Sequence, residues 1–198
     1  MSSAHGSNDI FDRLLEQRII FIRDLLEAAE ANRAVAQLLH LEDRDPAAAI
    51  MLQINCTQAD LHAVLAIYDT MQIVCPPVST LCSGTAAGGA ALLLAAGAPG
   101  RRLALPSARV LLEPPRGRFM GSSREIDVQA RGLLRLSRQA SVLLARHTGQ
   151  PLDRIERDIE QRLWLSAEEA RTYGLVDRIT GAARGSEGSP GGLPTSSS

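Results

Sequence analysis

One segment, residues 78–97, constrains the fold of this chain more than any other. It reads VSTLCSGTAAGGAALLLAAG. It begins as a short apolar strand over residues 78–82, passes through a tight turn of small residues, and ends in an Ala/Leu run typical of a buried helix. A strand that enters a helix in this way indicates an α/β protein.

Other short apolar strands and amphipathic helices alternate along the chain and predict the same class. Strands are predicted at residues 19–22, 48–54 and 108–112. After the first of these, a helix is predicted whose apolar stripe consists of Leu25, Ala29, Ala36 and Leu39, and which Pro46 ends.

Two kinds of signal fix further helix boundaries. Asp60 is predicted to cap a helix that runs to about residue 74. Ser122 and Glu125 have the spacing of a capping box, so a long helix is predicted to begin there and to stop at Gly149. The predicted apolar face of this helix consists of Ile126, Ala130, Leu133, Leu134 and Leu144. A second capping box, formed by Ser166 and Glu169, predicts the start of another helix.

Composition limits the classes of function. The 198 residues are 45% hydrophobic and fit one domain, expected at residues 9–180 between a short flexible segment, 1–8, and a disordered Gly/Ser/Pro-rich tail, 181–198. A net charge of −1 gives no footprint for nucleic acid or a membrane surface. Cys56, Cys75 and Cys82 lack metal-ligand spacing. With no signal peptide and no long apolar run, we expect a soluble cytoplasmic protein without metal or cofactor.

Long stretches of the chain, in order, resemble the proteolytic subunit of the ATP-dependent Clp protease, a family of serine peptidases. They cover most of residues 9–179 and read DIFDRLLEQRIIFI, AIYDTMQ, LLLAAGAPGRRLALPSARV, ARHTGQPLDRIERD and LSAEEARTYGLVDRI. The resemblance implies a crotonase-like fold of stacked ββα units that assembles into heptameric rings. It also implies that the long helix over residues 122–147 and the strand before it form a protruding handle, by which two rings meet.

Family catalysis needs a serine nucleophile, a histidine base and an aspartate that orients the histidine. In register with the family, these three places fall on Gly88, Glu113 and Arg162. None of the three retains the required chemistry. We expect Glu113 and Arg162 to form an ion pair where the catalytic hydrogen bond would lie.

The oxyanion hole also departs from the family pattern. Gln58 and Ala59 stand where the family has a pair of glycines, and Gly89 is left to offer the second backbone N–H. Cys56 is a conceivable substitute nucleophile, but no base is adjacent to it in the sequence, and an inert buried thiol is the commoner state.

The sequence therefore predicts a Clp proteolytic subunit homologue that is catalytically inactive and acts as a structural or regulatory subunit. Its expected partners are active Clp proteolytic subunits, in homo- or hetero-oligomers. A Clp unfoldase ATPase is a further candidate, although Met51 and Gln53 stand where the family often has the aromatics that receive the ATPase loop. Two alternatives stay open. One is a residual serine-type endopeptidase with an altered site, and the other is a crotonase-type acyl-CoA enzyme with Glu113 as general acid/base.

Overall fold

The computed structural model describes residues 5–117 and 120–181, with the backbone alone for residues 5–9. Residues 1–4, and residues 182–198 of the tail expected to be disordered, lie outside this part of the chain. Helix α1 begins at His5, so it includes residues 5–8, which the sequence analysis assigned to a flexible segment.

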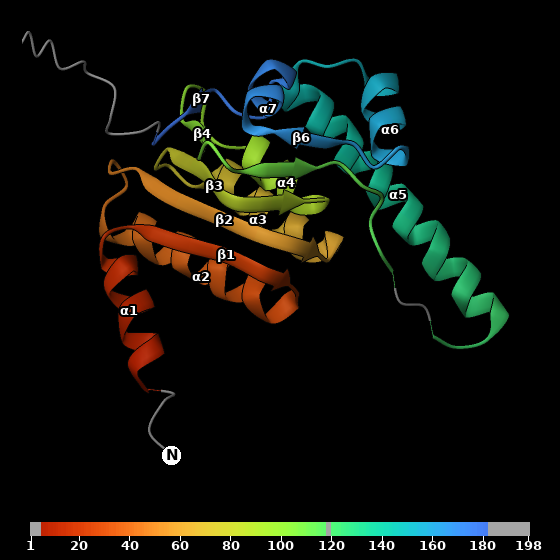
Figure 1. The fold of residues 1–198 in the computed structure, drawn as a ribbon. Coiled ribbons are helices and arrows are strands. Elements are labelled where there is room, and N and C mark those ends of the chain that lie inside the picture. Colours follow the sequence, from red (N-terminus) through yellow and green to blue (C-terminus); the bar gives the residue numbers. More distant parts are fainter. Residues whose placement is uncertain (1–4, 118–119, 182–198) are drawn as a thin grey trace, which may run out of the picture.

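A largely parallel sheet organises the described chain (Figure 1). Its main path runs in the order β1, β2, β3, β4, β7, and two further strands, β5 and β6, join it beside the end of β3. Among the strand pairs of the described residues, only β5–β6 is antiparallel. The bounds are β1 (Ile19–Leu26), β2 (Ile50–Ala59), β3 (Val78–Ala87), β4 (Arg102–Ala104), β5 (Arg109–Leu111), β6 (Trp164–Ser166) and β7 (Arg178–Ile179).

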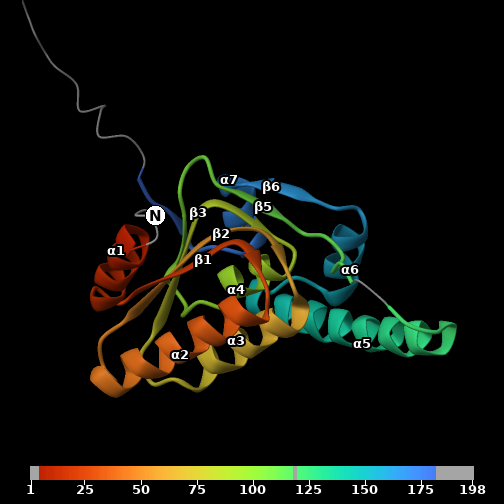
Figure 2. The same ribbon diagram turned by 90° about the horizontal axis from the view of Figure 1, so that it is seen from below.

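Seven helices lie within the described residues, and three of them provide the crossovers between the parallel strands β1, β2, β3 and β4. Two of them, α2 and α3, lie side by side along one face of the sheet (Figures 1 and 2). Helix α4 lies between the sheet and helices α3 and α5. The bounds are α1 (His5–Glu16), α2 (Ala28–Arg44), α3 (Leu61–Ile73), α4 (Gly89–Ala95), α5 (Ser123–Thr148), α6 (Leu152–Glu160) and α7 (Ala167–Tyr173). This order of strands and helices agrees with the crotonase-like α/β fold that the resemblance implies.

The core is densest around β2 and α4. On β2, Ile50, Leu52, Ile54 and Cys56 are all 0% exposed and alternate with partly or fully exposed residues. Six of the seven residues of α4 are buried, which explains its unbroken Ala/Leu sequence, because a helix covered on every side needs no polar face. The Ala/Leu helix predicted from residues 78–97 is therefore confirmed.

The stripe predicted for the helix after β1 is wrong. Leu25 belongs to β1, and Ala29, Ala36 and Leu39 of α2 are exposed. The buried residues of α2 are instead Ala31, Ala34, Leu38 and Leu41. Both sets have helical spacing, so an alanine-rich sequence does not by itself show which side faces the core.

The turn after residue 82 was also placed too early. Strand β3 continues to Ala87, because its last three residues still pair with β5, from Thr85 opposite Arg109 to Ala87 opposite Leu111. The small residues at positions 83–87 are compatible with a strand as well as with a turn, so the sequence alone did not show where β3 ends. The short strands β4, β6 and β7 escaped prediction because two or three residues carry no recognisable period.

Helix α5 extends well beyond the sheet (Figures 1 and 2). Ser122 caps it in a capping box with Glu125, and Gly149, with φ 72°, ends it, as predicted. Ser141 and Leu144 are its only buried residues. Most of its N-terminal half is exposed, and of the predicted apolar face only Leu144 is fully buried while Leu134 is 68% exposed.

Arg102 ties the base of α5 to the C-terminal elements. Its Nη2 lies 2.6 Å from Oδ1 of Asp177, and its Nη1 donates to the carbonyl oxygens of Ala95, His147 and Gly174. One guanidinium thereby holds the ends of α4, α5 and α7 against β4. The side chains of Arg102 and Asp177 are only 13% and 20% exposed.

Candidate functional site

Gly88 occupies a sharp turn between β3 and α4. It has φ 55° and ψ −119°, a conformation that residues with a side chain rarely adopt, and its N–H donates to the carbonyl oxygen of Leu111 at 2.8 Å. In a nucleophile elbow, a serine stands on a strained strand-to-helix turn of this kind. The turn is present here, but the residue on it has no side chain with which to attack a substrate.

Glu113 lies directly beside Gly88, just after β5. A β-carbon placed on Gly88 would lie 3.5 Å from Cγ and 3.9 Å from Oε1 of Glu113. The structure thus brings these two sequence-predicted site residues together. The other carboxylate oxygen, Oε2, accepts a hydrogen bond from Nη2 of Arg116 at 3.0 Å.

The expected ion pair between Glu113 and Arg162 is wrong. The β5–β6 ladder pairs Leu111 with Trp164, and Leu112 N donates to Leu163 O, so the next step would set Glu113 opposite Arg162. The backbone turns at that point, because Arg162 has φ 54°, and the Arg162 side chain is exposed. Within the described residues Arg162 makes no ion pair or hydrogen bond with Glu113; Arg116 takes that role.

Sequence reasoning missed Arg116 as a site residue. It lies three residues after Glu113, beyond Pro114 and Pro115. Two prolines fix φ and so restrict the backbone between them, and the guanidinium of Arg116 reaches back to the carboxylate. That spacing, Glu-Pro-Pro-Arg, was the available signal. The Glu113 side chain is 5% exposed, whereas Arg116 is 56% exposed and reaches solvent.

The two predicted oxyanion positions, Gln58 and Gly89, line different hollows. Gln58 lies near the end of β2, paired with Leu25 of β1, and is exposed. Gly89 begins α4, and a β-carbon there would lie 2.6 Å from Cγ2 of Val64 on α3. Close packing of α4 on α3 therefore requires glycine at position 89, whatever its N–H does.

The hollow beside Gly88 is small. Its volume is about 30 Å³, and its lining combines Glu113 and Ser137 with apolar side chains from five elements or their ends. A volume of that size holds about one or two water molecules and no acyl chain. The apolar lining residues include Leu61, Leu92, Leu112, Leu144 and Ile159.

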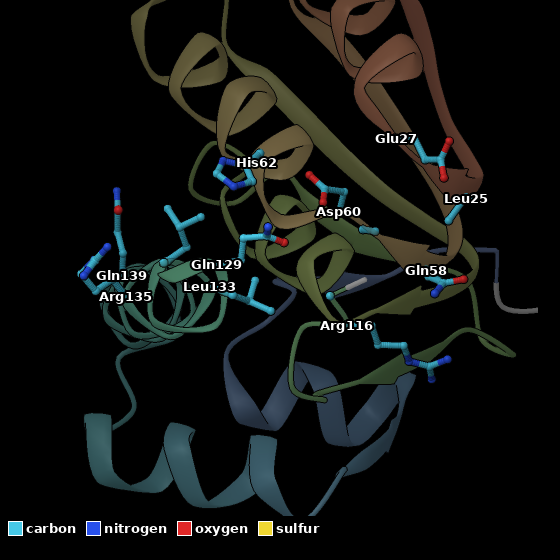
Figure 3. Close-up of a pocket in the computed structure, with 14 residues that line it drawn as sticks. Leu25, Glu27, Gln58, Asp60, His62, Arg116, Gln129, Leu133, Arg135 and Gln139 are labelled. Carbon is cyan, nitrogen blue, oxygen red and sulfur yellow. The ribbon is translucent and has the colours of Figure 1, made fainter. Parts of the chain in front are cut away.

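A larger cleft of about 940 Å³ opens between α5, the start of α3 and the ends of β1 and β2 (Figure 3). Arg116, His62, Gln58 and Gln129 are among its polar lining residues. Asp60 also lines it, but its side chain accepts a hydrogen bond from the N–H of Ala63 as the cap of α3. Among the described residues, the lining contains no serine, threonine or cysteine, so this part of the chain offers the cleft no side-chain hydroxyl or thiol as a nucleophile.

The thiols do not supply a substitute. Burial raises the pKa of Cys56, more than its hydrogen bond to the carbonyl oxygen of Gln58 lowers it. Burial raises the pKa of Cys82 to about 11. Cys75 is exposed, and hydrogen bonding to Glu42 raises its pKa. All three are therefore thiols at neutral pH, and a thiol is a poor nucleophile compared with a thiolate.

The strand–elbow–helix arrangement within a crotonase-like sheet defines the class of protein. A sequence model of the Clp protease family matches residues 2–183, nearly the whole chain. The chain therefore belongs to the Clp protease family. None of its helices, in the part that the structure describes, has the length and apolar character needed to span a membrane. The same residues contain no cluster of three or more His, Cys, Asp or Glu side chains arranged to hold a metal ion.

Proposed function

We propose that this chain is a non-catalytic member of the Clp protease family that acts as a structural or regulatory subunit of a cytoplasmic Clp proteolytic complex. The observation that carries the proposal is the pair of neighbours Gly88 and Glu113. The turn suited to a nucleophile carries no side chain, and the group beside it is a carboxylate already engaged by Arg116.

Magnitudes support inactivity. Removing a serine-protease triad lowers turnover by about 2 × 10⁶, and the residual rate depends on binding and on the oxyanion hole. Here Gly88, Glu113 and Arg162 stand in the three family places, and Gln58 and Ala59 replace the glycines of the oxyanion loop. Both sources of rate enhancement are therefore weakened together.

The two enzyme alternatives are less well supported. A residual endopeptidase would need another nucleophile, and the three thiols are protonated at neutral pH. Ser137 lines the hollow beside Gly88, but no histidine is among the described residues that line it to take the proton of its hydroxyl. An acyl-CoA enzyme would need room for an acyl chain beside Glu113. The hollow there is about 30 Å³, and Glu113 is held by Arg116.

Co-assembly tests the proposal directly. The chain is co-expressed with an active subunit of the family, and the complex is isolated through a tag on this chain and weighed by native mass spectrometry. We expect mixed rings of about seven or fourteen subunits. A chain that stays monomeric both alone and beside every family paralogue of the same cell would refute the structural role.

Activity is measured on the same material. The purified chain is incubated with a fluorogenic peptide, a serine-reactive phosphonate and an acyl-CoA, with an active family subunit as the matched control. We expect no cleavage, no phosphonate adduct and no acyl-CoA turnover by this chain. Peptide cleavage that survives removal of all active subunits would establish the endopeptidase alternative, and acyl-CoA turnover would establish the other.

Docking of a Clp unfoldase ATPase remains a separate question. The family often carries aromatics where this chain has Met51 and Gln53 on β2. Both side chains are only partly exposed. We propose that the ATPase binds mixed rings through their active subunits, and pull-down of the ATPase by rings of this chain alone would contradict that.

A further inference from the structure

The exposed side of α5 carries a stripe of arginines. Arg124, Arg131, Arg135, Arg138 and Arg146 are all exposed, and their spacings of seven, four, three and eight residues bring them back to one side of the helix. At 3.6 residues per turn, this side lies about 160° around the helix from the buried Leu144. We call these five residues the arginine stripe.

The stripe is largely uncompensated within the described part of the chain. Helix α5 contains two acidic residues, Glu125 and Asp127, against five arginines. Glu125 accepts hydrogen bonds from Ser122 in the capping box, and Asp127 lies 2.8 Å from Arg131. Arg124, Arg135 and Arg138 have no ion-pair partner there. The chain as a whole has a net charge of −1, so positive charge is concentrated on this helix.

Apolar side chains lie among these charges. Val128 is 61% exposed and Val142 is 47% exposed, and both fall within the stripe by helical spacing. The N-terminal part of the helix extends away from the rest of the domain (Figures 1 and 2). A projecting helix with exposed valines gains stability when another surface covers it, because packing supplies most of the stability of helices in proteins.

Charge and apolar character together define the partner. Nucleic acid would satisfy the arginines but would leave the valines uncovered, whereas an acidic amphipathic helix satisfies both. A second copy of the stripe would place arginines against arginines, and like charges facing each other across an interface oppose association.

We propose that the arginine stripe docks an acidic amphipathic helix of a different subunit and disfavours pairing with a second copy of this chain. The proposal deepens the function proposed above and rests on it, because it names the chemistry of the subunit that this chain assembles with. On this proposal, α5 both binds a partner subunit and determines which subunit is bound.

A charge-swap experiment tests this proposal by mixing the full chain with a variant of itself in which the charge of α5 is reversed. The variant Arg124→Glu/Arg135→Glu/Arg138→Glu changes the charge of α5 from an excess of three positive to an excess of three negative. Wild type, variant and an equimolar mixture are sedimented at about 0.05 M and about 0.5 M salt, after circular dichroism has shown that both fold. We expect the mixture at low salt to form a species of twice the mass that neither protein forms alone, with an association constant at least about tenfold lower at high salt.

The matched control reverses three exposed arginines elsewhere, Arg33, Arg44 and Arg101, which have no ion-pair partner among the described residues. It makes the same change in net charge, and its mixture with wild type should not double in mass. Three results would each overturn the proposal: a mass of wild type alone that is twice as large at low salt as at high salt, no doubling in the charge-swapped mixture, or equal doubling with the control.

Two further readouts separate this proposal from others. The doubling is scored relative to whatever species each protein forms alone, so it is informative even if co-assembly with an active subunit fails. A fluorescein-labelled DNA duplex is titrated in parallel. Duplex binding that is tighter than the charge-swapped association, and that the triple variant abolishes, would assign the stripe to nucleic acid and overturn the proposed protein partner.

Discussion

Nη2 of Arg116 lies 3.0 Å from Oε2 of Glu113, while the other carboxylate oxygen of Glu113 faces the turn at Gly88. The carboxylate is nearly buried, whereas the Arg116 side chain is more than half exposed. An ionised carboxylate only accepts hydrogen bonds. Glu113 stands where the family has its histidine base, and one of its carboxylate oxygens already accepts a hydrogen bond from Arg116.

The contact predicts unequal effects of two arginine substitutions. Arg116→Gln should lower the free energy of unfolding by about 1–2 kcal/mol, because it leaves a nearly buried carboxylate without its charged donor. Arg162→Gln should change it by less than about 0.5 kcal/mol, because that side chain is exposed and has no contact with Glu113. Urea unfolding of both variants measures the difference. A loss for Arg162→Gln as large as that for Arg116→Gln would show that the two arginines share the carboxylate.

Restoring a serine at the turn should not restore activity. Gly88→Ser places a hydroxyl beside Glu113, but the carboxylate is held by Arg116, and no histidine is among the described residues that line the hollow there to take the proton. The positive φ of Gly88 should also make the variant about 1–2 kcal/mol less stable. The assay is cleavage of a fluorogenic peptide, and we expect none for this variant.

Two companion variants separate the causes of that result. Gly88→Ala introduces a β-carbon at the same positive φ but no hydroxyl, so its free energy of unfolding should match that of Gly88→Ser. The triple change Gly88→Ser/Glu113→His/Arg162→Asp supplies all three chemical roles, but Arg162 turns away from the site and Gln58 and Ala59 remain, so weak activity is the most we expect. Rapid cleavage by the single variant would mean that another group acts as the base.

The sequence was sufficient to predict the fold and the neighbourhood of the site. The strand–turn–helix segment around Gly88, both capping boxes and the proximity of Gly88 to Glu113 all follow from local patterns or family register. Such features depend on a few adjacent residues, or on a frame that the whole family shares.

Side-chain partners could not be predicted in the same way. The register of β5 and β6 leads toward a Glu113–Arg162 contact, but one positive φ at Arg162 turns its side chain to solvent. Likewise, the predicted and the buried stripes around α2 both have helical spacing and both consist of alanine and leucine. Both outcomes depend on backbone geometry and packing across elements, which a periodic pattern does not specify.

The Arg102–Asp177 pair should be a major source of stability. Burial would raise the pKa of Asp177, but hydrogen bonds and the charge of Arg102 outweigh it and keep the pKa below its ordinary value. Asp177→Asn should lower the free energy of unfolding by about 3 kcal/mol at neutral pH, because Arg102 remains partly buried without its counter-charge. Since the native pKa is depressed, the wild-type advantage should shrink as the pH falls through that pKa. Urea unfolding at neutral and acidic pH tests both points, and a constant difference would contradict the pairing.

His147 should make stability depend on pH on the acid side of neutrality. It ends α5, where a helix terminus favours a cation, yet burial and the charges of Arg146 and Arg102 lower its pKa. Its Nε2 lies 2.9 Å from the hydroxyl of Tyr68. The unfolded chain therefore binds a proton more readily than the native one, so stability should fall as the pH drops below about 6.5.

The substitution His147→Gln should remove that part of the fall, so the difference in unfolding free energy between wild type and variant should narrow from about pH 7 to about pH 5. Tyr68→Phe is the matched control. It deletes the hydrogen bond but leaves His147 next to Arg146 and Arg102, so it should lower stability by about 1 kcal/mol and keep the pH dependence. Thermal or urea unfolding across this pH range measures both variants. If His147→Gln and wild type lose stability in parallel, His147 is protonated as easily in the native protein as in the unfolded chain, and the burial at the end of α5 is not what sets its charge.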